Sequence, residues 1–155
     1  MKINLVCVGK TNEDHINEGI KIYEKRILRY ISYKSISTSE ARKGLSKELQ
    51  KIEEGQIILK KLSPDDFLIL LDEKGIEFDS VQFASLIEKH MIQSTKSMVF
   101  VIGGPYGFSD EIYGRANYKL SLSKMTFSHQ LIRLIFAEQL YRAFTIIRGE
   151  PYHHI

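Results

Sequence analysis

The residues best suited to chemistry lie near the end of the chain, where an apolar stretch carries a few polar side chains. Glu138 and Arg142 are four residues apart, so on a helix they share one face and can pair. Tyr152 and His153 follow in the C-terminal tail. An aromatic ring and an imidazole directly after a buried helix can complete a site, whereas a structural ion pair and a frayed tail are the alternatives.

Two loops between predicted elements have the composition of a ligand site. Residues 103–109 (Gly-Gly-Pro-Tyr-Gly-Phe-Ser) follow one predicted strand, and residues 122–127 (Leu-Ser-Lys-Met-Thr-Phe) follow another. In open α/β sheets, ligands bind outside the carboxyl ends of the strands, and glycines allow a ligand to approach the backbone. Either loop taken alone is also compatible with a plain connector.

Several common motifs are absent from the sequence. Gly9-Lys10-Thr11 follows the first predicted strand, but a phosphate loop also needs a glycine five residues before Gly9, where Asn4 stands. No G-x-G-x-x-G follows that strand and no G-x-S-x-G occurs, so a standard dinucleotide fold and a nucleophile elbow lack their signatures. The five histidines form no H-E-x-x-H, and the single cysteine excludes a multi-cysteine site. We therefore expect no metal.

The composition fits one globular domain, which we expect to span residues 1–155. Hydrophobic residues make up 43% of the chain and charged residues 26%. No apolar run approaches the ~20 residues that span a bilayer, and the apolar stretch at the N-terminus is too short for a secretory signal. A single cysteine, Cys7, suits a reducing compartment. These features predict a cytoplasmic protein without membrane contact.

The positive charge is concentrated in the last quarter of the chain. Residues 1–114 hold 16 Lys/Arg and 17 Asp/Glu, a net charge of −1, whereas residues 115–155 hold 6 and 2, a net charge of +4. This quarter also contains histidines and tyrosines, a mixture suited to phosphate contact and base stacking. A solvated basic surface is the simpler alternative, so the pattern favours a nucleic-acid partner without deciding it.

Strand and helix patterns alternate along the chain. Short apolar runs predict strands at Lys2–Val8, Tyr33–Ser37, Phe67–Leu71, Met98–Ile102 and Tyr118–Leu122. Helical spacing predicts helices from an N-cap at Asn12 to about Tyr30, over about Ser46–Lys61, after a capping box of Asp79 and Gln82, from Ser109, and from Ser128 to about Ile147. Asp72-Glu73-Lys74-Gly75 predicts a turn after the third strand. The alternation indicates an α/β fold with a mainly parallel sheet and helices on both faces.

The last predicted helix is apolar around nearly its whole circumference. A helix of this kind must be buried on more than one side. In a fold of this size a second subunit is the natural cover, and long loops folded over the helix are the alternative. We therefore expect a homodimer.

Three spaced motifs and the end of the chain agree with one known family. They are Phe100-Val101-Ile102-Gly103-Gly104-Pro105-x-Gly107, the run from Leu120 to Gln130 (LSLSKMTFSHQ), Leu140-Tyr141-Arg142-Ala143-Phe144, and Pro151-Tyr152-His153. Together they resemble the RlmH family of bacterial rRNA methyltransferases, and the similarity covers the whole chain. The sequence departs from similar family members at Ser128, where proline is common, and at the last residues His154 and Ile155.

The resemblance implies a fold, a methyl donor and a substrate. The family belongs to the SPOUT class, whose members bind S-adenosylmethionine in a deep C-terminal trefoil knot and work as homodimers. It methylates N3 of a pseudouridine in 23S rRNA of the assembled ribosome. By resemblance, the donor pocket contains Leu71, Gly103, Leu122, Ser123, Lys124, Met125, Thr126 and Phe127.

The resemblance also suggests roles for the polar residues near the C-terminus. Methyl transfer from a sulfonium is an in-line displacement, so the protein mainly positions the reactants and helps to deprotonate the imide. Arg142 is expected to stabilise negative charge on the uracil ring, and Tyr152 to stack or hydrogen-bond with it. Either His153 or Glu138 is expected to accept its proton. The RNA contact is expected to involve Arg133, Arg142, Arg148 and the partner subunit.

Two other classes of function remain open from the residues alone. A noncatalytic ribosome- or rRNA-binding module would explain the basic last quarter, and it would bind ribosomes without S-adenosylmethionine. A small-molecule α/β enzyme would explain the glycine loop, and it would show no salt-sensitive affinity for rRNA.

Overall fold

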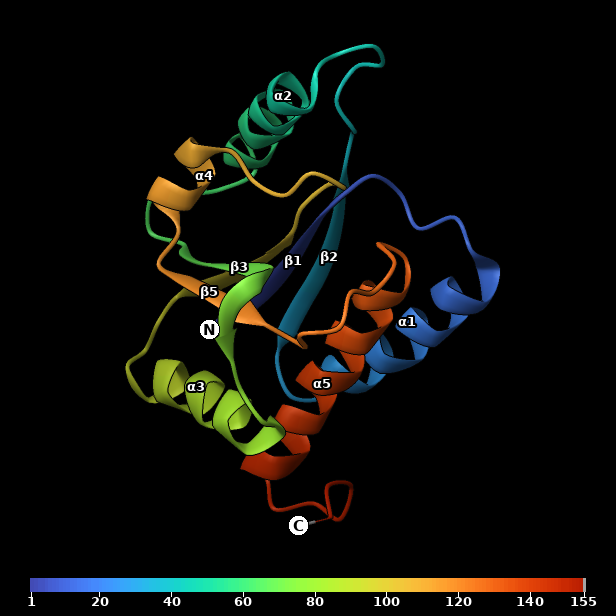
Figure 1. The fold of residues 1–155 in the computed structure, drawn as a ribbon. Helices are drawn as coiled ribbons and strands as arrows, with labels where there is room; N and C mark the ends of the chain where they lie inside the picture. Colours follow the sequence, from blue (N-terminus) through green and yellow to red (C-terminus); the bar gives the residue numbers. More distant parts are fainter. Residues whose placement is uncertain (155) are drawn as a thin grey trace.

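The computed structural model describes residues 1–154, and one five-stranded sheet forms the centre of the molecule (Figure 1). Ile155, one of the divergent last residues, lies outside the described residues. The strands are β1 (Lys2–Val8), β2 (Ser32–Thr38), β3 (Phe67–Glu77), β4 (Ser97–Ile102) and β5 (Tyr118–Ser121). Their order in the sheet is β2-β1-β4-β3-β5, and every neighbouring pair is parallel. The predicted parallel sheet is therefore confirmed.

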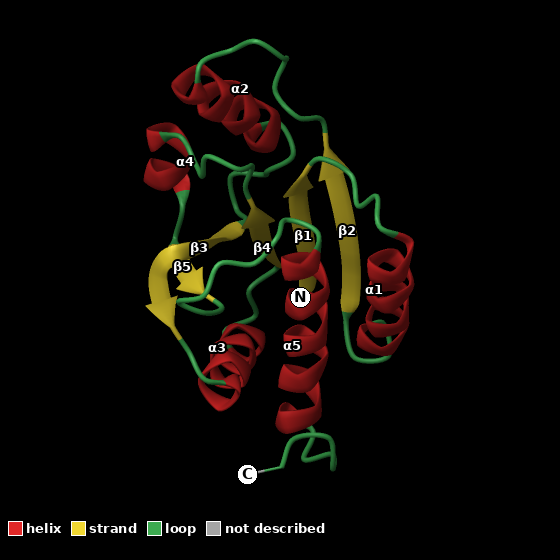
Figure 2. Cartoon of the chain, turned by 45° about the vertical axis from the view of Figure 1, so that its right-hand side comes forward, coloured by secondary structure: helices red, strands yellow, loops and turns green. Residues whose placement is uncertain are grey.

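Helices cover both faces of the sheet, as the alternating pattern predicts (Figure 2). On one face lie α1 (Asp14–Ile27), α3 (Ser80–Ile92) and α5 (Leu131–Ile147), and on the other lie α2 (Lys47–Leu59) and α4 (Asp110–Arg115). Successive side chains of a strand point to opposite faces, and β1 shows the result. Leu5 and Cys7 pack in the cluster under α1, α3 and α5, whereas Val6 and Val8 pack under α2 and α4.

The helix starts follow local capping in most cases. The predicted capping box before α3 is present, with Asp79 and Gln82 bonding each other's backbone N–H. The prediction of Asn12 as the N-cap of α1 is wrong, because α1 begins at Asp14 after Glu13. The backbone N–H of Asn12 instead donates to Oε1 of Gln130, 2.8 Å away. A contact between residues far apart in sequence thus replaces the expected cap.

The turn predicted at Asp72–Gly75 is also wrong, because β3 continues to Glu77. The register against β5 shifts between Leu71 and Ile76, so the extra residues are absorbed as an irregularity in the strand. A Cβ at Gly75 would lie 2.7 Å from the backbone of Leu120, so this glycine permits a close approach of two strands rather than a reversal.

Helix α5 lies between α1 and α3 on its face of the sheet (Figure 2). It begins at Leu131, three residues later than predicted, and Ser128 Oγ accepts the Leu131 N–H at 3.1 Å. Phe136, Leu140 and Phe144 are fully buried within the chain. The neighbouring helices α1 and α3 therefore cover part of the apolar surface of α5. That surface is the feature from which the sequence predicts a second subunit. In the part of the chain that the structure describes, no helix is both long and apolar enough to span a membrane.

Candidate active site

A cavity of about 350 Å³ opens where β4 and β5 end, beside the middle of β3. Its walls come from the extension of β3, from the glycine loop after β4, and from the segment between β5 and α5. The lining residues are Leu71, Asp72, Glu73, Lys74, Ile102, Gly103, Gly104, Pro105, Tyr106, Gly107, Phe108, Tyr113, Leu122, Ser123, Met125, Thr126, Phe127, His129 and Ile132. The two loops identified at predicted strand ends therefore form one concave site.

The residues expected to contact a methyl donor meet at this cavity, with one exception. Leu71, Gly103, Leu122, Ser123, Met125, Thr126 and Phe127 all line it. Lys124 does not: its side chain is 86% exposed and its Nζ lies 3.9 Å from Oε1 of Glu77. The segment therefore turns Lys124 outward while its neighbours face the cavity.

The glycine loop packs tightly behind the cavity. A Cβ at Gly103 would lie 2.9 Å from Cε1 of Phe108, and a Cβ at Gly104 would collide with the carboxylate of Glu54. Gly107 has a φ of +82°, a conformation that favours glycine. Glycines at Gly103 and Gly104 therefore leave room for neighbouring side chains, and Gly107 turns the backbone.

Several polar lining residues have no role predicted from the sequence, among them Tyr113, Asp72 and His129. The hydroxyl of Tyr113 on α4 donates to Oδ2 of Asp72. Burial raises the pKa of Tyr113 and the hydrogen bond to Asp72 raises it further, so the phenol stays protonated. Burial lowers the pKa of His129, and the charge of Arg133 lowers it further, which keeps this imidazole neutral at neutral pH. His129 lies inside a quoted motif, but neither Asp72 nor Tyr113 carries a sequence signal.

The four residues singled out near the C-terminus form a second group, which we call the tail cluster: Glu138, Arg142, Tyr152 and His153. Arg142 donates to Oε1 of Glu138 from Nε at 3.1 Å and from Nη2 at 2.6 Å. Tyr152 donates to the same oxygen at 3.1 Å, and its ring lies 4.8 Å from Cζ of Arg142. Arg142 Nη1 is 3.3 Å from Nδ1 of His153. The predicted pairing of Glu138 and Arg142 is confirmed.

The tail cluster fixes the protonation of Tyr152. Burial raises the pKa of Tyr152, and its hydrogen bonds with Tyr23 and Glu138 raise it further, so the phenol remains a donor. The cluster thus presents a guanidinium, a neutral phenol and an imidazole together.

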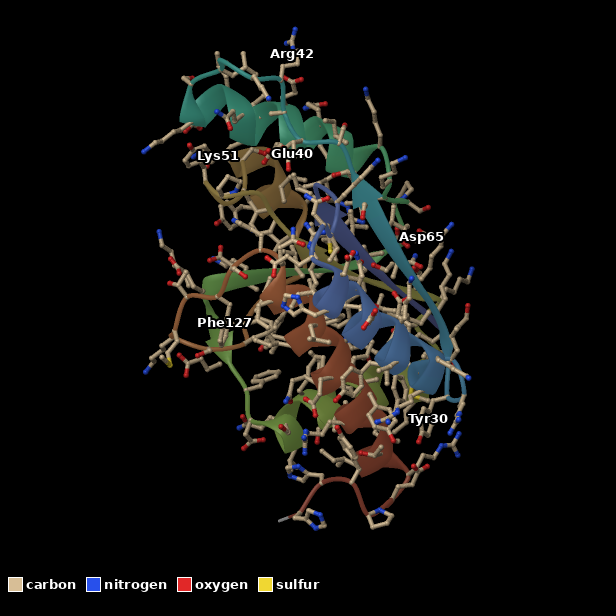
Figure 3. The ribbon with its side chains drawn as sticks, turned by 90° about the vertical axis from the view of Figure 1, so that its right-hand side faces the viewer. Tyr30, Glu40, Arg42, Lys51, Asp65 and Phe127 are labelled. Atoms are coloured by element: carbon tan, nitrogen blue, oxygen red, sulfur yellow. The ribbon has the colours of Figure 1, made fainter. Side chains whose placement is uncertain are left out.

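The cavity and the tail cluster lie at opposite ends of α5. Ile132 lines the cavity, whereas Arg142 lies ten residues further along, about 15 Å along a helix axis. Figure 3 shows the separation: Phe127 marks the cavity segment, and Tyr30, which bonds Glu150 of the tail, lies near the other end. Within one chain, the two groups do not form a common site.

Arg133 does not belong to either group, contrary to the expectation that it contacts RNA. Its side chain is buried, and Nη2 donates to the carbonyl oxygen of Val8 at 2.7 Å. Nη1 donates to the carbonyl of Gly9 at 3.0 Å and to Oγ1 of Thr11 at 2.9 Å. Arg148, by contrast, is exposed after α5. Part of the positive charge of the last quarter is therefore structural.

The fold is that of a parallel α/β protein, and its cavity lies at the carboxyl ends of β4 and β5, the place where ligands bind in open α/β sheets. In residues 1–154, no group of three His, Cys, Asp or Glu side chains is arranged to hold a metal ion.

The chain belongs to the SPOUT methyltransferase family, because the profile described as predicted SPOUT methyltransferase matches residues 1–153. This confirms the resemblance, and membership implies the trefoil knot. The chain is 53% identical to ribosomal RNA large subunit methyltransferase H of Parabacteroides distasonis over 156 aligned positions, which cover 99% of each chain. It is 51% identical to the protein of the same name from Christiangramia forsetii, again over 99% of each chain.

A solved structure shares the fold at low sequence identity. It is a probable methylase family protein from Haemophilus influenzae Rd KW20, with a TM-score of 0.55 and 11% identity. The match covers 99% of this chain and 70% of that one. At this identity, the likeness supports the fold alone.

Proposed function

We propose that this protein is a homodimeric methyltransferase that transfers the methyl group of S-adenosylmethionine to N3 of a pseudouridine in 23S rRNA of the assembled ribosome, in the cytoplasm. The observation that carries the proposal is the convergence of three segments of a methyltransferase-family chain on one cavity. The full-length identity to proteins named ribosomal RNA large subunit methyltransferase H supports rRNA as the substrate class. A noncatalytic ribosome-binding module would have no need of such a cavity.

The lining of the cavity fits S-adenosylmethionine, a molecule with a purine, a ribose and a charged amino-acid arm. Its volume lies in the range of small-molecule sites. Apolar side chains such as Leu122 and Phe127 provide surfaces for the purine, and Asp72 and Glu73 supply acceptors for hydroxyl or ammonium groups. When bound, the sulfonium supplies an activated methyl group, so the chain itself needs no covalent nucleophile.

The tail cluster has the chemistry to bind the acceptor nucleotide. The imide nitrogen must lose a proton before or during methylation, and the guanidinium of Arg142 stabilises the negative charge that then develops on the ring. Tyr152 offers a ring for stacking and a hydroxyl for donation.

Both candidate proton acceptors, Glu138 and His153, contact the guanidinium of Arg142. Glu138 Oε1 already accepts bonds from Arg142 and Tyr152, and Oε2 accepts the Gln139 side chain at 2.8 Å. Nδ1 of His153 lies 3.3 Å from Nη1 of Arg142. Glu138 positions Arg142, and either His153 or Glu138 accepts the imide proton as its contact with Arg142 breaks.

The geometry of α5 supports the proposed homodimer. The cavity lies at the first turn of the helix and the tail cluster at its last turns, so one chain cannot bring both to the same nucleotide. In an antiparallel two-fold contact between α5 helices, each tail lies beside the cavity of the other subunit.

The test is incubation with radiolabelled S-adenosylmethionine and ribosomes that lack the modification, followed by mapping of the labelled nucleotide. We expect one labelled pseudouridine in 23S rRNA, with the label at N3. Binding of ribosomes without any transfer of label would favour the noncatalytic module. Label on a small molecule but not on rRNA would favour a small-molecule enzyme.

A further inference from the structure

An exposed aromatic ring with a cation above it lies at the rim of the cavity. Tyr106 of the glycine loop lines the cavity, yet 43% of the residue is exposed. Nζ of Lys47, the first residue of α2, lies 5.4 Å from the centroid of the Tyr106 ring. Neither residue belongs to the tail cluster, and the two come from segments on the other face of the sheet from α5.

The surroundings of Lys47 contain both basic and acidic side chains. Arg42 and Lys43 are exposed in the loop that leads into α2, and Figure 3 shows Arg42 at the outer end of this part of the molecule. Within residues 1–154, ion pairs engage Arg42 with Glu53 and Lys51 with Glu48, whereas Lys47 makes no ion pair. The N-terminal end of α2 adds a partial positive charge at the same place.

We propose that Lys47 and Tyr106 form a second contact for the rRNA substrate, in which Tyr106 stacks on an unpaired base near the target and Lys47 contacts a neighbouring phosphate. The inference rests on the proposed function. Sequence-specific RNA contacts commonly use unpaired bases stacked on aromatic rings, together with cations at the backbone. An aromatic ring and a lysine at the mouth of the cavity offer both.

Lys47 and Tyr106 lie where they can contact a part of the RNA strand that the tail cluster does not. A nucleotide whose base reaches the cavity must pass its rim, and its neighbours in the strand then lie against the surface outside. Tyr106 and Lys47 form that surface on the side of the glycine loop and α2. The acceptor strand is therefore held at two places: the target base at the tail cluster and a flanking base at the rim.

The experiment measures methylation of unmodified ribosomes at several salt concentrations, together with calorimetric binding of S-adenosylmethionine. The variants are Tyr106→Ala, Tyr106→Phe and Lys47→Gln. The matched control is Lys60→Gln, an exposed lysine at the other end of α2, about 20 Å from Lys47 along the helix.

We expect Tyr106→Ala to raise the KM for ribosomes about 5- to 150-fold, the usual range for loss of one stacked base, while Tyr106→Phe stays near wild type. Lys47→Gln should raise the same KM and reduce the slope of log KM against log salt by about 0.7, the value for one phosphate contact on a single strand. Lys60→Gln should change neither quantity. The dissociation constant of S-adenosylmethionine should remain close to wild type in Lys47→Gln and Lys60→Gln, whose side chains do not line the cavity.

Three results would overturn the inference. An unchanged ribosome KM in both Tyr106→Ala and Lys47→Gln would leave the pair with no role in RNA binding. If Tyr106→Ala binds S-adenosylmethionine more weakly and Lys47→Gln keeps the wild-type salt dependence, Tyr106 contacts the methyl donor and not the RNA. Equal salt effects in Lys47→Gln and Lys60→Gln would indicate general electrostatic attraction. If the wild-type protein methylates no rRNA, the proposed function itself fails, which is a separate outcome.

Discussion

The hydroxyl of Tyr113 donates a 2.5 Å hydrogen bond to Oδ2 of Asp72 and thereby connects α4 to the extension of β3. The other carboxylate oxygen of Asp72 accepts the backbone N–H of Lys74 at 2.9 Å. The Tyr113 ring stands edge-on against Phe108 of the glycine loop, with centroids 5.8 Å apart. One side chain thus fixes two of the three segments that form the cavity wall.

Replacing Tyr113 by Phe should weaken binding of S-adenosylmethionine, because the β3 extension loses its bond to α4. We expect a loss of about 0.5–1.5 kcal/mol in the free energy of unfolding and a higher dissociation constant for the donor. Denaturant unfolding and calorimetry measure the two quantities. Tyr118→Phe is the matched control, since the ring of Tyr118 packs against Phe78 away from the cavity lining. Identical donor binding in both variants would show that the bond does not shape the cavity.

Replacing Gly103 by Val should prevent binding of S-adenosylmethionine. The new side chain would meet Phe108 and crowd the cavity. Gly114→Val is the control, because a Cβ at Gly114 meets no atom within 4 Å. Calorimetry on folded protein decides the matter, and thermal unfolding of both variants checks that the fold persists. Unchanged donor affinity in Gly103→Val would place the donor site elsewhere.

Replacing Arg142 or His153 by Ala should abolish methyl transfer while donor binding persists, since both side chains lie outside the cavity lining. Loss of one contact made mainly in the transition state costs about 3–4 kcal/mol, which appears in kcat/KM. Arg142→Lys keeps the charge but loses the two-point contact with Glu138, so it should recover activity only in part. Near-normal turnover in both alanine variants would reduce the tail cluster to a structural role.

Replacing Arg133 by Met should destabilise the fold without a specific effect on RNA binding. The variant leaves the buried carbonyl oxygens of Val8 and Gly9 without their charged donor. We expect a loss of about 2–5 kcal/mol, measured by denaturant unfolding. Arg148→Ala, at an exposed position, should instead leave stability unchanged and lower the salt dependence of ribosome binding. If the Arg133→Met protein is stable but binds ribosomes more weakly, Arg133 contributes to RNA binding after all.

The sequence predicts the local elements well because strand length, apolar periodicity and capping are local properties. The buried run of β4 and the Asp79 capping box illustrate this. Tertiary contacts decide the rest. Asp72–Gly75 has turn composition, yet pairing with β5 keeps it in β3, and Gly75 is needed for the close approach to Leu120.

The candidate site likewise has some residues that the sequence predicts and others that only tertiary contacts bring together. The glycine loop and the segment before α5 can be found because ligand sites lie at strand ends, and the resemblance added Leu71. No sequence pattern indicates that Asp72 and Tyr113 belong to the site, because their side chains meet only when α4 folds against β3. The sequence also does not predict that Arg133 is buried, because its partners are backbone carbonyls more than 120 residues away along the chain.

The separation of the cavity from the tail cluster predicts an active site shared between two subunits. A dimer in which the α5 helices cross antiparallel would bring the tail of one chain to the cavity of the other. To test this, a Gly103→Val chain, which cannot bind donor, is combined with a chain truncated after Pro151, which lacks Tyr152 and His153 of the tail cluster. Each parent dimer should be inactive.

The mixed dimer distinguishes shared sites from independent ones. If sites are shared, one site in the mixed dimer joins the intact cavity of the truncated chain to the intact tail of the Gly103→Val chain, and activity returns towards half of wild type. If each subunit works alone, every site carries one lesion and the mixture stays inactive. Subunit exchange must be verified by mass, with co-expression where mixing fails, because an apolar interface exchanges slowly. A verified mixed dimer without activity would contradict the shared site and confine catalysis to one chain. The two groups would then have to act together across the nine residues of α5 that separate Ile132 from Arg142.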